Sequence, residues 1–380
     1  MSTPASAPHA PLRLNVFVFL SSAATTGVLG LLTVLYPKAS EHWLQWAQAR
    51  VSAAFGAWYM VLVVACLAFV VWLAGSRYGR IRLGRDDEAP AFGYVSWVAM
   101  LFSAGIGIAL LYYGAYEPLD HFLAPPSQPG GTVAAAREAM ALTFLHWGLH
   151  GWALYALVGV TLAYFAYRRG QPLALRSALY PLFGERAHGR IGDMVDGFGI
   201  LATLVSMVTN LGIGALVIQS GLVYLFGIPA TPHVLVLIVL AMMAVATVGV
   251  VSGIEKGIAW LSNLNVILLC ALLLFVLVTG PTLHLLDGMV QNTGDYLAGF
   301  VHKSFDMYLN DAPARAWLGN WTLFYWAWWI AWAPFVGLFV ARISRGRSVR
   351  EVVLGVLLIP LGFTLAWLSI FGNTAIDLVL

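Results

Sequence analysis

Residues 321–335 read Trp-Thr-Leu-Phe-Tyr-Trp-Ala-Trp-Trp-Ile-Ala-Trp-Ala-Pro-Phe, a run with five tryptophans and no charged side chain. In an α-helix, at about 100° per residue, one narrow face of this run and its continuation is aromatic. That face carries Trp321, Tyr325, Trp328, Trp332, Phe335 and Phe339. Trp321 and Trp332 would lie about 16 Å apart along the axis, which is too far for a belt at headgroup depth. The run therefore predicts a membrane-spanning helix with a buried aromatic column.

A column of indole rings is suited to bind a cation. Each indole face attracts a cation by about 0.5–2 kcal/mol, and quaternary ammonium is the ligand that aromatic cages suit best. A trimethylammonium head donates no conventional hydrogen bond, so ring faces replace its water better than carboxylates alone. A channel or pump for small hydrated cations more often carries acidic residues inside its spans. The predicted spans contain few of them, so we expect an onium ligand.

A second aromatic motif, residues 146–155, lies in another apolar stretch. On a continuous helix Trp152 and Tyr155 lie about 60° apart, and Trp147 lies about 80° beyond Tyr155. All three side chains could then point into one cavity. The pair His146 and His150 has the spacing of a zinc site, but no carboxylate sits between or near the two histidines. We favour the alternative, in which each histidine hydrogen-bonds a neighbouring helix.

A third motif is the glycine-rich stretch 103–109, Ser-Ala-Gly-Ile-Gly-Ile-Ala, in the middle of an apolar run. Glycine weakens a helix and exposes carbonyl groups, which inside a bilayer must be satisfied by neighbours, water or an ion. Broken helices of this kind often form substrate and cation sites in transporters. Close helix packing through small residues is an equally good interpretation, and the sequence leaves both open.

Composition makes this an all-α integral membrane protein. Of the 380 residues, 60% are hydrophobic and only 10% are charged, whereas a soluble domain carries about 25% charged residues. Such a chain cannot cover itself with a polar surface, so lipid must cover much of it. The net charge of +3 gives no reason to expect nucleic-acid binding. The sequence shows no Ser/His/Asp set, metal-ligand cluster or paired carboxylates, so we predict neither an enzyme nor a metal site.

A transmembrane helix needs about 20 apolar residues, and nine segments qualify. They are 14–36, 51–75, 94–116, 141–167, 195–226, 232–251, 257–279, 320–341 and 351–376. The fifth could be tilted, or broken at Gly212 and Gly214. The mixed segment 283–316 is interpreted as an amphipathic helix lying at the membrane interface.

The positions of lysine and arginine predict the orientation. If the polar tail 1–13 is cytoplasmic, 15 of the 20 lysine and arginine residues lie in cytoplasmic segments. We therefore expect a cytoplasmic N-terminus and an outer C-terminus. The chain stops at Leu380 directly after a hydrophobic span, so we expect a truncated form of a longer protein.

The motifs together resemble the betaine/choline/carnitine transporter (BCCT) family. The matching stretches are Ile81–Gly84, Ser96–Gly105, Glu117–Leu119, His146–Tyr155, Arg176–Leu182 and Trp321–Arg347. The likeness extends from about residue 14 to the end of the chain. The tryptophan-rich run that leads into Ala341-Arg342-Ile343-Ser344-Arg345-Gly346 is its most specific part.

The resemblance implies a LeuT-like fold built from two inverted five-helix repeats. Segment 14–75 would form two peripheral helices, 94–279 the first repeat, and 320–380 the start of a second repeat whose remainder, about three helices and a tail, is missing. It also implies a bacterial cytoplasmic membrane, a homotrimer, and a sodium or proton gradient as the driving force, with no other cofactor.

The resemblance also implies roles for individual residues. The ammonium cage would consist of Trp147, Trp152, Tyr155 and Trp329, and Trp328 and Trp332 would line the path. One ion site would lie near Ser103 and Ile106, and a second would use Thr203 and Phe335. In that second site Met207 replaces a threonine, and a thioether is a poor ligand for a hard cation. Sodium coupling is therefore doubtful and proton coupling is open.

The resemblance further implies a function and a substrate class. Choline-selective members tend to carry an aspartate where this chain has Ala109, so we expect a zwitterion such as glycine betaine. The leading hypothesis is uptake of this solute by alternating access. The alternatives are an osmosensor or receptor that binds the solute without moving it, and a fragment that does not transport by itself.

Overall fold

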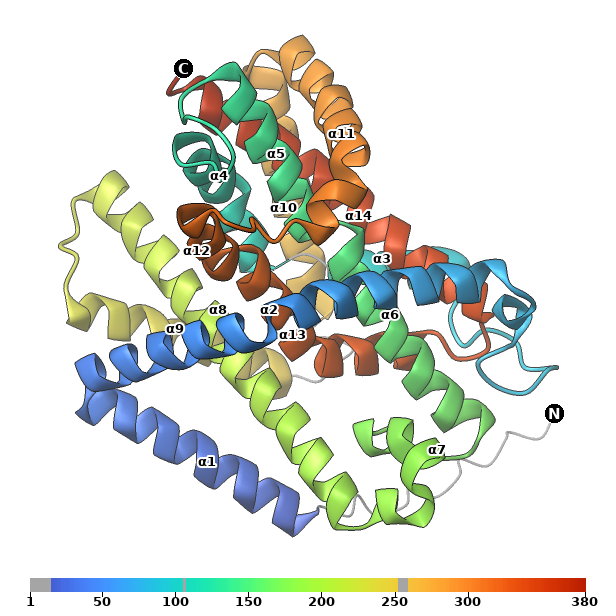
Figure 1. The fold of residues 1–380 in the computed structure, drawn as a ribbon. Coiled ribbons are helices and arrows are strands. Elements are labelled where there is room, and N and C mark those ends of the chain that lie inside the picture. Colours follow the sequence, from blue (N-terminus) through green and yellow to red (C-terminus); the bar gives the residue numbers. More distant parts are fainter. Residues whose placement is uncertain (1–14, 105–106, 252–258) are drawn as a thin grey trace.

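The computed structural model describes residues 15–104, 107–251 and 259–380, which are almost entirely helical. Within these residues the extended pairing amounts to an isolated bridge between Arg82 and Ser348, with no named strand. The all-α prediction is therefore confirmed. Figure 1 shows the helices in chain order. They are α1 (Val16–Leu35), α2 (Pro37–Gly75), α3 (Tyr94–Ala104), α4 (Ile108–Leu123), α5 (Val133–Trp147), α6 (Leu149–Ala163), α7 (Tyr180–Phe183), α8 (Arg190–Phe226), α9 (Pro232–Val251), α10 (Ala259–Thr279), α11 (Thr282–Phe305), α12 (Ala312–Asn320), α13 (Thr322–Ile343) and α14 (Val349–Asp377).

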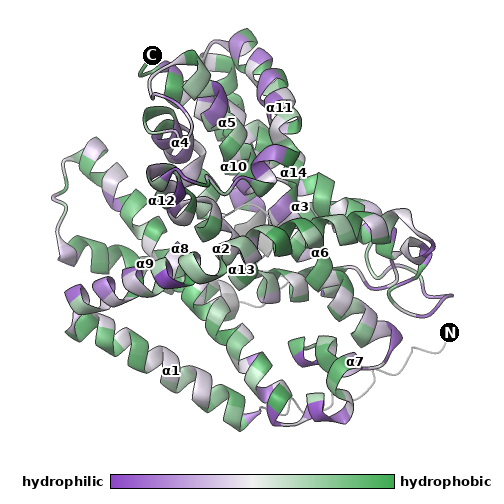
Figure 2. Cartoon of the chain, in the orientation of Figure 1, coloured by the Kyte–Doolittle hydropathy of each residue, from purple (hydrophilic) through white to green (hydrophobic). Residues whose placement is uncertain are grey.

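The helices have the length and surface of membrane spans. In the described part of the chain, 7 helices are long and apolar enough to cross a membrane, or up to 9 if each of two bent pairs counts as one span. Figure 2 shows mostly hydrophobic residues along α1, α8 and α9. Large apolar side chains on these helices are exposed, among them Phe19 at 53% and Leu237 at 65%. Lipid is the solvent that makes such exposure favourable.

Two predicted spans are not single straight helices. The predicted helix 94–116 is divided into α3 and α4, whose axes differ by 57°. The predicted helix 141–167 is interrupted at Gly148, between α5 and α6. The long helix α8 runs unbroken through Gly212 and Gly214, so the suggested break there is wrong.

The predicted amphipathic segment 283–316 forms α11 and the start of α12 rather than one helix. The buried residues of α11 are Leu285, Asn292, Tyr296 and Ser304, which recur at helical spacing on one face. That face packs on α5 and α14. The amphipathic, interfacial character of this segment and the division of the chain into repeats stay predictions.

The centre of the protein is formed by α6 and α13, which pack more extensively than any other helix pair in the described residues. Glycine allows the close approach: a Cβ atom at Gly159 of α6 would lie 2.6 Å from Val340 Cγ1. On the other side of α6, α14 packs against α4, α5 and α6. The tryptophan-rich helix is therefore held against the second aromatic motif along most of its length.

The α6–α13 contact gives a test of the fold. Gly159→Ala should lower the free energy of unfolding by about 1–3 kcal/mol, because the added methyl group overpacks the interface. The measurement is the thermal midpoint of the purified chain in detergent. Gly212→Ala on α8 is the matched control, since nothing lies within 4 Å of its added Cβ. A Gly159→Ala midpoint equal to that of the control would contradict the packing described.

Candidate substrate-binding site

An aromatic cavity of about 300 Å³ lies between α4, α5, α6, α8 and α13. It is lined by Gly107, Ile108, Ala109, Leu110, Trp147, Trp152, Tyr155, Asn210, Tyr325, Trp328, Trp329, Trp332, Phe335 and Val336. All six residues that the sequence predicts for the ligand site, Trp147, Trp152, Tyr155, Trp328, Trp329 and Trp332, are in this set. The structure thus brings the two aromatic motifs together, and we call this cavity the aromatic cage.

Trp329 lies at the centre of the aromatic cage. Its ring centroid is 4.8 Å from that of Tyr155, 5.5 Å from that of Trp152 and 6.3 Å from that of Trp147. These are ordinary edge and tilted contacts between aromatic rings. Trp328 extends the wall on the other side of Trp147, at 6.3 Å. Three of these rings come from the motif at 146–155 and two from α13, so neither motif forms the cage alone.

The break at Gly148 positions the cage residues. The helix end leaves backbone groups without intrahelical partners, and in an apolar layer these must be satisfied by other parts of the protein. Trp329 Nε1 donates to the carbonyl of His146 at 2.9 Å, and the Leu149 amide donates to the Tyr296 hydroxyl at 3.2 Å. A Cβ at Gly148 would collide with the Phe144 carbonyl and with Tyr296. The freed carbonyl therefore fixes the orientation of Trp329.

A carboxylate that the sequence analysis did not select lies directly behind the cage. Glu117 of α4 is fully buried. Its Oε2 accepts hydrogen bonds from Trp147 Nε1, at 2.8 Å, and from the Tyr325 hydroxyl. Trp147 and Tyr325 both line the cavity, so Glu117 orients two of its walls. An acidic residue inside a membrane span is a signal for function. Glu117 was not selected because it directly follows the last residue of the predicted helix 94–116.

The two histidines of the second motif bridge to neighbouring helices, as predicted. His146 Nε2 pairs with the Thr322 hydroxyl of α13 at 2.9 Å, and His150 Nε2 pairs with the Ser304 hydroxyl of α11 at 3.0 Å. The statement that no carboxylate lies near the pair is wrong, because His146 Nδ1 is 2.6 Å from Glu117 Oε1. This contact depends on the packing of α4 against α5, which the sequence alone does not reveal.

Glu117, His121 and His146 bring their side-chain N and O atoms within 4.8 Å of one another. Both ring nitrogens of His146 already have protein partners, and His121 Nε2 lies 3.3 Å from Glu117 Oε1 without the alignment of a hydrogen bond. A metal ion would have to displace these contacts. We therefore describe Glu117 and His146 as hydrogen-bonded partners with His121 beside them, and we call the three residues the Glu117 cluster.

Two of the residues predicted to bind ions, Ser103 and Thr203, use their hydroxyl groups within their own helices, and their role in ion binding stays a prediction. The Ser103 hydroxyl donates to the Met100 carbonyl at 3.0 Å, and the Thr203 hydroxyl donates to the Gly199 carbonyl at 2.8 Å, both within their own helices. Ile106 lies outside the described residues.

Thr203 does share a second cavity, of about 440 Å³, with Met207 and Phe335. One hydroxyl, one thioether and one phenyl ring do not provide the several oxygen ligands that a hard cation requires. This donor set does not fit a sodium ion.

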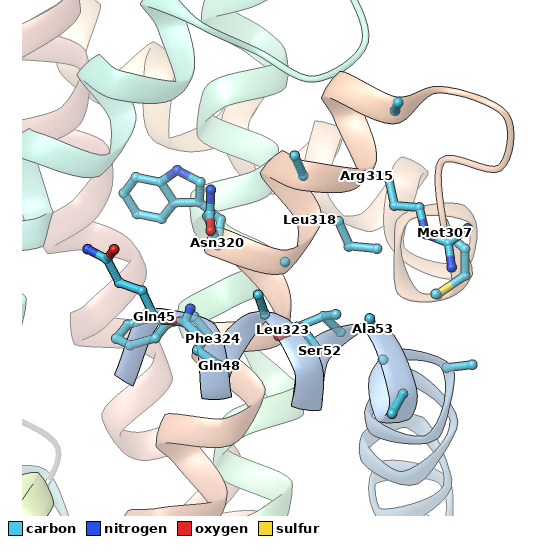
Figure 3. A pocket seen from close by; sticks show the side chains of 18 of the residues that line it. Gln45, Gln48, Ser52, Ala53, Met307, Arg315, Leu318, Asn320, Leu323 and Phe324 are labelled. Atoms are coloured by element: carbon cyan, nitrogen blue, oxygen red, sulfur yellow. The ribbon is translucent and has the colours of Figure 1, made fainter. Parts of the chain in front are cut away.

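A larger cavity of about 910 Å³ lies between α2, α12 and the start of α13. Figure 3 shows its polar wall, with Gln45, Gln48 and Ser52 on α2 facing Asn320 across the opening. Tyr113 lines this cavity too, and its ring also contacts those of Trp147 and Trp328 of the cage, at 6.1 and 5.7 Å. We call the larger space the outer cavity, and Tyr113 separates it from the aromatic cage.

The cage has unpartnered hydrogen-bond donors but no charged side chain in its lining. Trp152 Nε1 and Trp328 Nε1 are buried without a hydrogen-bond partner. Such groups are uncommon in folded proteins and each calls for an explanation. The cage can therefore offer ring faces to a cation, whereas the two free indole N–H groups have no surface accessible from the cavity.

The family model and the similar proteins all describe transporters of choline, betaine or carnitine. Residues 17–380 match the family described as BCCT, the betaine/carnitine/choline family transporters. The chain is 65% identical over 373 residues to the osmo-independent choline transporter BetT1 of Acinetobacter baylyi, covering 98% of this chain and 71% of that protein. It is 45% identical over 364 residues to the high-affinity choline transport protein of Escherichia coli, covering 96% of this chain and 54% of that protein. It is 44% identical over 362 residues to the glycine betaine transporter OpuD of Bacillus subtilis, covering 95% and 71%.

The bonds to Glu117 give a test of the site. Tyr325→Phe removes one donor from a buried carboxylate and should lower the free energy of unfolding by about 1–3 kcal/mol. The readout is again the thermal midpoint in detergent. Tyr112→Phe is the control, because Tyr112 makes ring contacts and its hydroxyl has no hydrogen bond in the structure. We expect the control to change stability by less than about 0.5 kcal/mol. Equal effects of the two substitutions would show that the Tyr325 hydroxyl does not stabilise the cluster.

Proposed function

The chain belongs to the betaine/carnitine/choline transporter family, and on this premise we propose that it imports a small quaternary ammonium solute, choline or glycine betaine, across a membrane. The single observation that carries the proposal is the aromatic cage around Trp329. Five aromatic side chains, Trp147, Trp152, Tyr155, Trp328 and Trp329, line one cavity whose wall contains no charged residue. Because each ring contributes about 0.5–2 kcal/mol to the binding of an onium group, such a wall can replace the water around a trimethylammonium head.

Two features bear on which solute is bound. Ala109 lines the cage, so the position that led us to expect a zwitterion would lie beside a solute bound there. The names of the similar proteins divide between choline and glycine betaine, and the first of them, at 65% identity, is a choline transporter. We therefore propose that the cage recognises the trimethylammonium head that both solutes share.

The proposed route runs through the outer cavity and past Tyr113 to the cage. Trp321 and Phe324, at the start of α13, line the outer cavity, while Tyr325 and Trp328 in the following turn line the cage. Alternating access would then require this aromatic partition to open on one side while the other side is closed. We propose an ion gradient as the driving force, and the poor fit of the Thr203 and Met207 set to sodium favours protons.

We also propose a cytoplasmic N-terminus, a bacterial inner membrane and the homotrimer that the resemblance implies. The arginine-rich segments predicted to be cytoplasmic support the orientation, since they meet at one end of the protein. Arg82 donates to the Gly346 carbonyl at 2.9 Å, and Arg168 donates to the Gly84 carbonyl at 3.1 Å. The named relatives are bacterial.

The Trp329 series tests the cage. Trp329→Ala should weaken choline or betaine binding by roughly ten- to thirty-fold, because it removes a central ring face. Trp329→Phe should lose less, since it keeps a smaller ring face. Binding is measured by calorimetry on the purified chain. Trp58→Ala is the control, because Trp58 is 72% exposed on α2 and should leave affinity unchanged. Equal losses for Trp329→Ala and Trp329→Phe would rule out a cation–π site.

A neutral analogue tests whether charge is recognised. We expect choline to bind at least ten-fold more tightly than 3,3-dimethylbutan-1-ol, which has the same shape but no charge, because ring faces attract the cation by up to about 2 kcal/mol each. Similar affinities would mean that the cavity selects by size alone. Accumulation of labelled choline or betaine in vesicles containing the chain then tests transport, and saturable binding without accumulation would favour a sensor.

A further inference from the structure

The aromatic cage has two unlike sides. Its rings come from α5, α6 and α13, whereas α4 and α8 contribute no aromatic side chain to the lining. The side chains from α4 are those of Ile108, Ala109 and Leu110, which are aliphatic, and α8 contributes Asn210. An onium head held against the rings leaves the rest of the solute facing α4 and α8. Within the described lining, Asn210 therefore carries the polar side chain of this non-aromatic side.

The face of α8 that carries Asn210 is packed against the start of α4. Gly214 lies one turn further along the same face, since residues four positions apart on a helix are neighbours. A Cβ atom added to Gly214 would lie 2.5 Å from Ile108 Cδ1. Ile108 is itself part of the cage lining. The position of Asn210 in the cage wall is thus set by the close packing of two helices.

The orientation of the Asn210 amide is set by its own helix. Its Nδ2 atom donates to the Ser206 carbonyl at 3.0 Å. A carbonyl group only accepts, so the amide nitrogen and not the amide oxygen must face Ser206. Oδ1 is then turned away from that bond. In the described part of the chain Oδ1 has no hydrogen-bond partner, and it is not fully buried. It is therefore an accessible acceptor in the cage wall.

The other polar side chains of the cage do not supply an equivalent acceptor. The indole N–H groups of the tryptophans only donate. The Tyr325 hydroxyl donates to Glu117 and accepts from Trp147 Nε1 at 3.1 Å. The Tyr155 hydroxyl makes no hydrogen bond in the structure, but it belongs to α6, on the aromatic side of the cage. Asn210 Oδ1 is the side-chain acceptor that the described lining offers on the non-aromatic side.

We propose that Asn210 is a specificity-determining residue, whose Oδ1 accepts a hydrogen bond from the hydroxyl group of choline while the rings hold the trimethylammonium head. This inference rests on the proposed function and deepens it, because it selects an onium alcohol over an onium carboxylate. A hydroxyl group can donate to Oδ1, whereas the carboxylate of glycine betaine only accepts. A carboxylate placed against Oδ1 would leave two acceptors facing each other without a donor, which is unfavourable where water is excluded.

The experiment compares choline with ethyltrimethylammonium, which has the same head and the same carbon chain but no hydroxyl group. Calorimetry on the purified chain should show choline binding about three- to ten-fold more tightly, the effect of one hydrogen bond. Asn210→Leu replaces the amide by an apolar group of similar size. The affinity ratio of the two ligands should then fall to one or below, because the hydroxyl group loses its water without gaining an acceptor.

Three further variants make the comparison specific. Thr209→Val changes the neighbouring residue of α8, an exposed threonine whose hydroxyl donates to the Val205 carbonyl at 3.0 Å, and it should keep the wild-type ratio. Tyr155→Phe removes the other free hydroxyl of the cage but retains the ring, and it should also keep the ratio, whatever its effect on either affinity. Asn210→Ala removes the amide without adding bulk, and it repeats the test if the leucine side chain obstructs the cavity.

Several outcomes would overturn the role of Asn210 while leaving the proposed function intact. These are equal affinities of the wild-type chain for choline and ethyltrimethylammonium, and a ratio that persists in both Asn210 variants or is lost in Tyr155→Phe. A chain that binds glycine betaine but not choline would also overturn it. So would a loss of glycine betaine affinity in Asn210→Leu as large as that of choline, since the amide N–H group would then be the recognition element. Absence of binding of both solutes would instead overturn the proposed function, and this inference with it.

Discussion

The structure depends on the requirement that every backbone polar group in an apolar layer has a partner. Continuous helices meet it by themselves, but this chain interrupts a span at Gly148 and exposes the His146 carbonyl and the Leu149 amide. The side chains of Trp329 and Tyr296 satisfy these groups. The carbonyl that the break leaves free therefore holds Trp329, the central ring of the cage, in a fixed position. The break also allows Trp147, at the end of one helix, and Trp152, in the next, to face the same space.

The same requirement explains why the polar residues of the site are arranged in layers. The inner layer consists of ring faces and contains no charge, and the second layer contains Glu117 with its donors. The carboxyl group of Glu117 is thus separated from the cavity by one ring and is hydrogen-bonded at both oxygens. The indole N–H group of Trp147 bonds the carboxylate while its face lines the cavity, so one side chain belongs to both layers. A change in the charge of Glu117 would therefore also change what holds the Trp147 ring in its orientation.

Much of this was predictable from the sequence, for identifiable reasons. The spans follow from hydropathy because lipid is a uniform solvent, and the face of α13 follows from its aromatic spacing. The break at Gly148 was not predictable, since the apolar residues around it are compatible with a continuous helix. Glu117 was missed because its role depends on Trp147, His146 and Tyr325, which lie about 30 or about 200 positions away along the chain. Sequence periodicity identifies the face of a helix, but it contains no information about which distant face it meets.

The layered site also provides a reason for selectivity against small hydrated cations. A carboxylate in the cavity wall would attract sodium and potassium as well as an onium group, because it could replace part of their water with an oxygen ligand. Ring faces offer no such oxygen, so a small cation entering the cage loses its hydration without compensation. A trimethylammonium head is weakly hydrated and loses little. Glu117 lies behind Trp147 and Tyr325, where it orients these two rings but does not line the cavity and cannot coordinate an ion in it. The cation that gains most from this arrangement is one whose charge is already covered by methyl groups.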